Sequence, residues 1–181
     1  RHALIEVSDF TPSELPWCDL LIGLSRPPTC KKVLEHGSTL GVGSFHFFKA
    51  ELSEKSYLQS KLFQNRAYNE FLNNGISQSA IYFKRPVLKV DKYNPLEQYS
   101  HVEQKFILSF STTDTFETAN IDFSKSICLA IGPERGWTDK EIKTFKDNDF
   151  KEIRISSSVL RVETATFSAL GQLELLKMRN L

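Results

Sequence analysis

A run of five apolar residues, 127–131, leads directly into a Gly-Pro pair and is the feature that most constrains the fold. An uninterrupted run of this length predicts a strand buried on both faces, as in a parallel sheet covered by helices. Gly132 and Pro133 end it, because glycine accepts strained torsions and proline has no N–H to donate to a ladder. Thr138 and Glu141 have capping-box spacing, which predicts that a helix starts there.

The loop between this strand and the next helix is where open α/β sheets bind ligands. The alternative is an ordinary strand-to-helix turn without a ligand, because Gly-Pro turns are common. A second stretch, 154–166, repeats the pattern of a short strand, a small polar loop and then a terminal helix.

Together, Ile-Gly-Pro-Glu-x-Gly at 131–136 and Val-Leu-Arg-x-Glu-Thr-Ala at 159–165 resemble the closing motifs of the SPOUT methyltransferases. The match is closest to the RsmE type, which methylates N3 of a uridine in bacterial 16S ribosomal RNA. A weaker similarity runs through 31–42 and Gln78-Ser79. The resemblance therefore covers roughly residue 20 to the end of the chain and is strong in the last third.

Composition limits the classes of protein that this chain can represent. Its 181 residues suffice for one full core, and a net charge of +1 excludes a strongly basic RNA-binding domain but not a local basic patch. Three cysteines lack the spacing of metal ligands, so no metal site is predicted, and Cys128 reads as a packed apolar residue in the buried strand. The pattern favours a reduced, cytoplasmic protein without a membrane span.

Alternating strands and helices predict an α/β fold with a parallel sheet flanked by helices. The resemblance implies a SPOUT domain over 17–181 with a C-terminal trefoil knot, in which the segment from Ile131 onward threads through an earlier loop. Residues 1–16 are an N-terminal extension with one expected strand at 3–7, a possible remnant of a PUA-like barrel. Whether the barrel has been removed or was never present stays open.

The expected elements follow from apolar periodicity and from capping residues. Thr29 is the candidate N-cap of the first helix, and Gly41 is its C-terminal cap. Strands are expected at 17–24, 43–48, 105–110, 127–131 and 152–156, with a short strand within 81–90 that restarts after Pro86. Helices are expected at 31–40, 58–76, from Asn94-Pro95 onward, 138–147 and 162–178.

Proteins of the SPOUT type hold S-adenosylmethionine with backbone groups of three loops, which the resemblance maps here to 108–111, 131–136 and 155–160. Glycines and small residues suit such loops because they permit close approach, and apolar side chains form a wall for adenine. The expected cofactor-binding residues are Leu108, Ser109, Phe110, Ile131, Gly132, Pro133, Gly136, Ile155, Ser156, Val159 and Leu160.

Three charged motif residues, Arg161, Glu134 and Glu163, are the expected catalytic residues. Arg161 is expected to position the target uracil or to stabilise its developing oxyanion, as a preorganised donor does. The alternative is that Arg161 pairs with Glu134 or Glu163 and only holds the fold together, because buried charges are normally paired. Departures from the motifs bear on activity and target: Arg135 and Ser158 stand where the family has glycine and arginine, and Ser156 where it has another glycine. The family's arginine after Gln-Ser is also absent, with Ala80-Ile81 there instead.

The leading interpretation is an RsmE-type methyltransferase that acts on ribosomal RNA as a homodimer, with a pocket completed across the dimer interface. A second is a catalytically inactive protein that binds RNA or S-adenosylmethionine, and a third is a methyltransferase for a different RNA. Four basic residues are candidate phosphate contacts, although scattered surface charge is the better account of them: Arg26, Lys84, Arg85 and Lys89.

Overall fold

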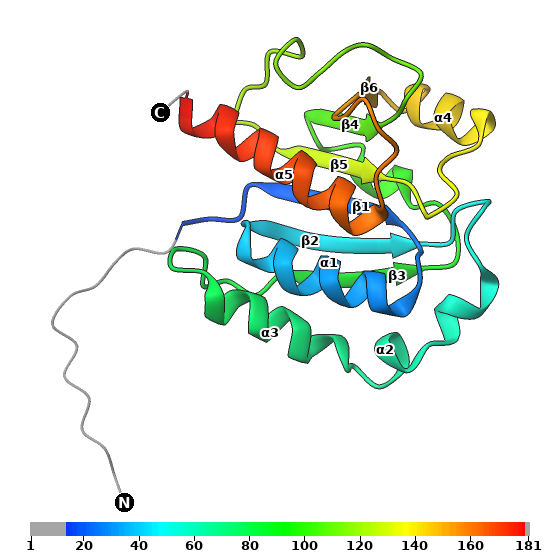
Figure 1. Ribbon diagram of the computed structural model, residues 1–181, viewed down its shortest axis with the longest axis vertical. Helices are drawn as coiled ribbons and strands as arrows, with labels where there is room; N and C mark the ends of the chain where they lie inside the picture. Colours follow the sequence, from blue (N-terminus) through cyan, green and yellow to red (C-terminus); the bar gives the residue numbers. More distant parts are fainter. Residues whose placement is uncertain (1–13, 180–181) are drawn as a thin grey trace, which may run out of the picture.

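The computed structural model describes residues 14–179, which form one six-stranded parallel sheet with helices on both faces (Figure 1). The strands lie in the order β3-β2-β1-β5-β4-β6. They are β1 (Cys18–Gly23), β2 (Val42–Phe48), β3 (Val87–Asp91), β4 (Gln104–Leu108), β5 (Ile127–Ile131) and β6 (Lys151–Ile153). The helices are α1 (Pro27–Thr39), α2 (Lys61–Gln64), α3 (Tyr68–Gln78), α4 (Asp139–Lys146) and α5 (Val162–Arg179), with two 3₁₀ helices, η1 (Lys55–Gln59) and η2 (Leu96–Tyr99).

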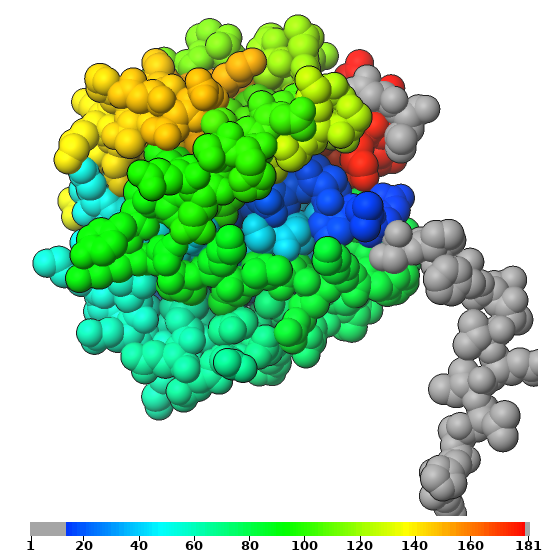
Figure 2. Space-filling model, turned by 180° about the vertical axis from the view of Figure 1, so that it is seen from behind, coloured from blue at the N-terminus to red at the C-terminus, as the bar shows by residue number. Residues whose placement is uncertain are grey.

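Alternate residues of the central strands enter two separate cores. In β5, Leu129 packs with α1 and α5 on one face, whereas Cys128 and Ala130 pack with Phe145 of α4 on the other. Figure 1 shows α1, α3 and α5 covering the front face, and Figure 2 shows the rear face, where the segment around η2 lies across the sheet. Because β5 is buried on both faces, as its composition predicts, all five of its residues are buried.

The expected fold class is confirmed in the parallel, helix-flanked sheet. The trefoil knot stays a prediction. The expected strand at 3–7 and nearly all of the expected extension lie outside the described residues. No helix within 14–179 is long and apolar enough to cross a membrane.

The first helix begins earlier than the sequence suggested. Pro27 and Pro28 are its first residues and Arg26 is the N-cap, so the prediction of Thr29 as N-cap was wrong. Proline is favoured in the first helical turn because its missing N–H would have no intrahelical partner there. At the other end, Gly41 has φ of +77°, as expected of a glycine that follows a helix.

The single long helix expected over 58–76 is also wrong. Arg66 has φ of +54°, which interrupts the helical path and leaves α2 and α3 as separate helices. The apolar residues that suggested one helix still pack against the same core, because each short helix turns its own apolar residues inward. The helix expected from Asn94-Pro95 is the short 3₁₀ helix η2.

The short strand expected within 81–90 is β3, and the remaining expected elements are confirmed to within four residues at their ends. In α4, the Thr138 hydroxyl accepts a hydrogen bond from Glu141 N, and the Glu141 carboxylate accepts one from Thr138 N, so the predicted capping box is present. In α5, Ala169, Leu170 and Leu173 are fully buried and pack into the core on one face of the helix.

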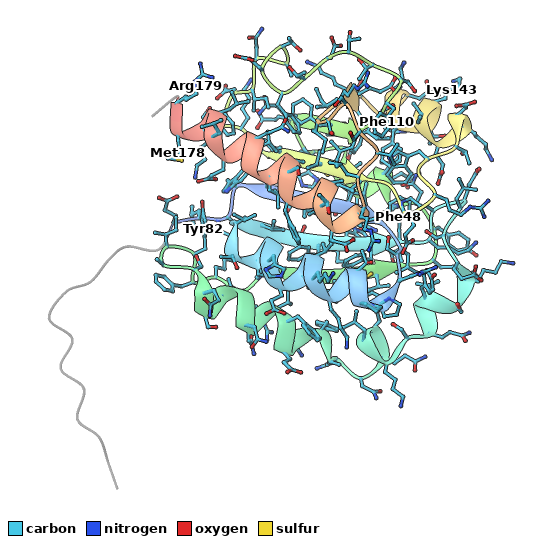
Figure 3. The ribbon with its side chains drawn as sticks, in the orientation of Figure 1. Phe48, Tyr82, Phe110, Lys143, Met178 and Arg179 are labelled. Carbon is cyan, nitrogen blue, oxygen red and sulfur yellow. The ribbon has the colours of Figure 1, made fainter. Side chains whose placement is uncertain are left out.

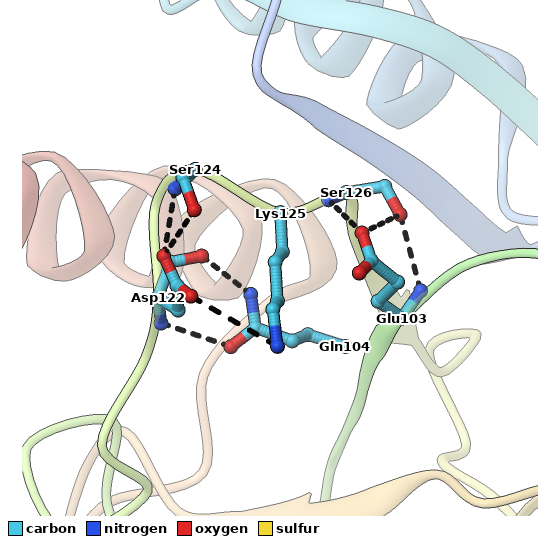
Figure 4. Close-up of polar contacts among 6 residues, drawn as sticks. All are labelled: Glu103, Gln104, Asp122, Ser124, Lys125 and Ser126. Atoms are coloured by element: carbon cyan, nitrogen blue, oxygen red, sulfur yellow. Dashed lines mark hydrogen bonds and ion pairs between the residues drawn. The ribbon is translucent and has the colours of Figure 1, made fainter.

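A long loop between β4 and β5 is closed by side chains at the start of β4 (Figure 4). Gln104 Nε2 donates to Asp122 O at 2.7 Å, and Asp122 N donates to Gln104 Oε1 at 3.0 Å. Nearby, Glu103 N donates to Ser126 Oγ at 3.1 Å. These bonds bring the chain back beside β4, so that β5 begins next to it and runs parallel to it.

Candidate active site

The carboxyl ends of β4 and β5 and the segment between β6 and α5 enclose a cavity of about 300 Å³. In an open parallel sheet this edge is the usual ligand site. The cavity is lined by nine of the predicted cofactor-binding residues: Leu108, Ser109, Phe110, Ile131, Gly132, Pro133, Gly136, Val159 and Leu160.

A smaller apolar crevice of about 80 Å³ adjoins this cavity, and the two share Leu108, Ser109, Phe110, Leu160 and Ala165 as lining residues. The two remaining predicted residues, Ile155 and Ser156, line this crevice. Three segments far apart in the sequence therefore meet at one edge of the sheet.

The motif loop after β5 is a tight turn built on two glycines. Gly136 N donates to Pro133 O at 2.8 Å, and Gly136 has φ of +72°, a value that side-chain-bearing residues rarely adopt. A β-carbon on Gly132 would lie only 3.3 Å from Gly136 Cα, so the two backbone segments meet over the cavity at van der Waals distance. Gly132 and Gly136, which carry no side chains, both line the cavity.

Arg135 occupies an exposed position of this turn and does not line the cavity. Its φ is not positive, because the only described non-glycine residues with positive φ are Arg66, Asn120 and Asp149. The position therefore accepts a side chain without strain. The departure from glycine leaves the described cavity open.

The motif loop is fixed against the end of β1 and the start of α1. A β-carbon on Gly23 would collide with the Pro133 ring, so only glycine permits this approach of β1 and the loop. The Glu134 carboxylate accepts a hydrogen bond from Arg26 N at 2.7 Å, at the N-terminus of α1, where negative charge is favoured. Glu134 also lines the cavity, so the loop and the helix start are joined at the site.

The other two expected catalytic residues lie outside the cavity lining. Glu163 pairs with Lys32 of α1 at 3.4 Å and holds the start of α5. Arg161 is exposed, and within residues 14–179 its side chain has no hydrogen bond or ion pair. The alternative pairing of Arg161 with Glu134 or Glu163 is therefore absent from the described structure, and its guanidinium is open to a ligand.

Comparison with known proteins adds an independent observation to this geometry. A model of the RNA methyltransferase domain matches residues 12–174. The chain belongs to this RNA methyltransferase family. Its relatives include "Ribosomal RNA small subunit methyltransferase E 1" of Borreliella burgdorferi, 34% identical over 83% of this chain and 63% of that protein. "Ribosomal RNA small subunit methyltransferase E" of Treponema pallidum is 30% identical over 92% of this chain and 65% of that protein.

The chain spans a little less than two thirds of the length of these two relatives. Among solved structures, ribosomal RNA small subunit methyltransferase E of Neisseria gonorrhoeae, crystallised with S-adenosylmethionine, superimposes with a TM-score of 0.77. That similarity covers 94% of this chain and 70% of the other at 22% identity, and it supports the fold.

Several residues of this methyltransferase domain line the cavity without having been predicted to do so: Trp137, Asp139, Ile142, Val162 and Ala165. Trp137 stacks on Phe48 with ring centres 5.9 Å apart and packs against Phe145 at 4.9 Å. A β-carbon on Gly132 would lie 3.4 Å from the Trp137 indole, so the indole packs directly against the motif loop. Trp137 directly follows the second glycine of the motif, and this position was the sequence signal that could have placed it at the site.

The serine-rich segment before α5 is ordered by its own hydrogen bonds. Ser158 N donates to Ser156 Oγ at 3.0 Å, and Gln172 of α5 donates to Ile155 O at 2.9 Å. Serine therefore replaces the glycine and arginine of the family motif while the loop keeps a defined path beside the crevice.

Cys128 and His46 are titratable residues that lie in the cores, away from the cavity. Burial raises the pKa of the Cys128 thiol well above its usual value, which makes it an inert packed residue, as predicted. His46 is fully buried in β2 and contacts Tyr99 and Asp91. Neither residue lines the candidate site.

Proposed function

We propose that this chain is an S-adenosylmethionine-dependent methyltransferase that acts on N3 of a uridine in 16S ribosomal RNA, in the cytoplasm. Residues 17–181 would be its SPOUT methyltransferase domain. The observation that carries the proposal is the convergence of three loops on one cavity in a chain of the RNA methyltransferase family. The names of the two relatives support ribosomal RNA as the substrate.

The residues around the cavity fit the cofactor. Gly136 lines the cavity with φ of +72°, a conformation that favours glycine, so the loop borders the cavity there without a side chain. Leu160 and Val162 supply apolar surface, and the loop 131–136 supplies backbone groups, the combination expected of a pocket for a nucleoside. When bound, S-adenosylmethionine supplies an electrophilic methyl group.

Of the three charged motif residues, Glu134 and Glu163 hold the backbone in position, and Arg161 is free to contact the substrate. Glu134 holds the motif loop on α1, and Glu163 holds the start of α5 through Lys32. Arg161 lies between them in sequence, exposed and without a side-chain partner among the described residues. In the proposed reaction its guanidinium positions the uracil and stabilises the negative charge that develops on the ring oxygen as the N3 proton leaves.

The test is methyl transfer from labelled S-adenosylmethionine to small-subunit ribosomal RNA, with the product nucleoside identified by mass spectrometry. The expected product is N3-methyluridine at one position, and Arg161→Ala should remove turnover while retaining cofactor binding. Cofactor binding without transfer to any ribosomal RNA would contradict the proposal and favour a non-catalytic binding protein. Transfer to another RNA or another base atom would correct the substrate.

We also propose that the enzyme is a homodimer that packs through α5. Leu175 and Met178 are 57% and 64% exposed, and Gly171 lies on the same helical face. A row of exposed apolar residues around a glycine allows the close approach of a second copy of the helix.

The dimer is tested by sedimentation. Leu175→Glu should convert the protein to a folded monomer that binds the cofactor more weakly. Tyr93→Glu is the matched control, because Tyr93 is 72% exposed but lies outside α5. A wild-type monomer, or a Leu175→Glu dimer, would contradict the proposed interface.

A further inference from the structure

Two side chains, Phe110 after β4 and Arg154 after β6, contact each other at the edge of the candidate site. Ser109 N donates to Ile153 O at 3.0 Å, so the pairing of the two strands continues past β4. The next residue of each strand is then brought together: the Arg154 guanidinium lies 5.6 Å from the centre of the Phe110 ring. Figure 3 labels Phe110 at this edge of the sheet.

Arg154 is held from two directions. Its backbone N donates to Asp114 O at 2.7 Å, and its Nε donates to Ser156 O at 3.1 Å. Within residues 14–179, its terminal nitrogens have no carboxylate within ion-pair distance. The Nε bond therefore holds the guanidinium beside the ring, while its outer N–H groups remain free to donate.

Phe110 lies at the mouth of the site rather than in its interior. The residue is 52% exposed and lines both the cavity and the crevice, so it stands on the ridge between them. Val159, which is 84% exposed, lines the cavity beside it. A half-exposed ring at the opening of a ligand site presents a flat apolar surface to whatever approaches from solvent.

The chain also lacks, near this contact, an arginine that the resembled motif has. Ser158 stands where the resembled motif has arginine, and Ser158 and Arg154 line the same crevice. Arg154, four residues earlier on the same segment, thus supplies a guanidinium at this rim. A flat ring beside a fixed guanidinium is the combination with which proteins hold unpaired bases and their phosphates.

We propose that the Phe110 ring stacks on an unpaired nucleobase of the RNA substrate while Arg154 fixes the ring and contacts the neighbouring phosphate. This inference rests on the proposed function and deepens it, because it names the residues that select single-stranded RNA. The cofactor uses backbone groups of the same segment, so truncation of the Phe110 side chain leaves those groups in place. Stacking on an unpaired base also favours a target that is already outside a duplex.

The test measures two affinities for each variant: fluorescence anisotropy with a labelled oligouridylate, and calorimetry with S-adenosylhomocysteine. Phe110→Ala should weaken oligouridylate binding about 5- to 150-fold, the effect of losing one stacked base. Its affinity for S-adenosylhomocysteine should fall by much less than its affinity for oligouridylate, because the backbone groups of this segment stay in place. Phe110→Tyr should retain RNA binding, and Tyr93→Ala, an exposed aromatic residue outside the site, should leave both affinities unchanged.

A second probe separates the base from the phosphates. On an abasic ribose-phosphate oligomer of the same length, Phe110→Ala should bind as the wild type does. Arg154→Ala should bind both oligomers more weakly, and the slope of log affinity against log salt should fall by about one, as expected for one lost phosphate contact. Arg154→Lys should restore that slope without restoring the full affinity for oligouridylate.

Two results would overturn this inference and leave the proposed function standing. If Phe110→Ala lowers the affinity for S-adenosylhomocysteine and leaves RNA binding unchanged, the ring belongs to the cofactor. If Phe110→Ala changes neither affinity, the ring binds neither ligand. A folded wild-type protein that fails to bind S-adenosylhomocysteine would instead overturn the proposed function and this inference together.

Discussion

At the residue scale, Glu134 joins the motif loop to the first helix. Its carboxylate accepts the Arg26 N–H at 2.7 Å, at a helix start where the two prolines provide no N–H of their own. A residue chosen from the sequence for its charge therefore acts here by holding backbone in position.

Glu134→Ala should lower the free energy of unfolding by about 1 kcal/mol, the usual effect of a lost cap, and weaken S-adenosylhomocysteine binding several-fold. Glu134→Gln keeps an oxygen acceptor and should recover most of both losses. Urea denaturation and calorimetry measure the two effects. Equal behaviour of the Ala and Gln variants would show that the hydrogen bond to Arg26 is unimportant.

His46 is a buried histidine whose contacts make stability depend on pH. Its Nε2 lies 2.8 Å from Asp91 Oδ2 and its Nδ1 lies 3.0 Å from the Tyr99 hydroxyl. Burial lowers the pKa of His46, and the nearby Asp91 carboxylate only partly opposes this effect. The folded protein therefore favours the neutral imidazole.

Because the folded pKa of His46 lies below its unfolded value of about 6.5, its contribution to stability is complete above that pH and declines as the pH falls below it. The thermal unfolding midpoint should therefore fall between about pH 6.5 and 5. His46→Gln, which does not titrate, should show a flatter pH profile over this window. An unchanged profile in the variant would assign the acid sensitivity to other groups.

At the element scale, α1 and α3 pack closely because α3 carries glycine at the contact. A β-carbon on Gly75 would collide with the Glu35 carbonyl oxygen of α1 and would lie 2.7 Å from Ser38 Cβ. The Thr39 hydroxyl donates to Gly75 O at 3.2 Å across the same interface. Helix propensity alone favours alanine at such a position by about 1 kcal/mol, so packing and propensity oppose each other.

Gly75→Ala should destabilise the protein by about 1–3 kcal/mol, because overpacking outweighs propensity. Asn73→Ala is the matched control on an exposed position of the same helix and should be neutral or slightly stabilising. Both are measured by urea denaturation. A more stable Gly75→Ala variant would show that the two helices can move apart at little cost.

The same elements show what sequence patterns can and cannot predict. The strand β5 and the capping box of α4 were predictable because each depends on residues adjacent in the chain. The break at Arg66 was not, because apolar spacing survives when a helix is divided into two that pack on the same core. Gly23 and Trp137 escaped notice at the site because their importance depends on contacts with the motif loop, which only the fold brings about.

At the scale of the whole molecule, the sheet order places β4, β5 and β6 so that their carboxyl ends open on one cavity. The predicted cofactor residues meet there because a parallel sheet directs all these ends to one edge. The positions of Arg161 and Glu163 outside the lining were not predictable, since they depend on how α5 packs on α1.

The most direct test is calorimetric titration of S-adenosylhomocysteine into the wild type, Gly132→Val and Arg135→Gly. The wild type should bind one molecule per chain. Gly132→Val should lose binding while it remains folded, because its side chain would press on Gly136 and Trp137 and displace the loop that lines the cavity. Arg135→Gly should bind as the wild type does, since Arg135 is exposed and does not line the cavity. Equal binding by the wild type and Gly132→Val, or no binding by a folded wild type, would contradict the assignment of the cavity.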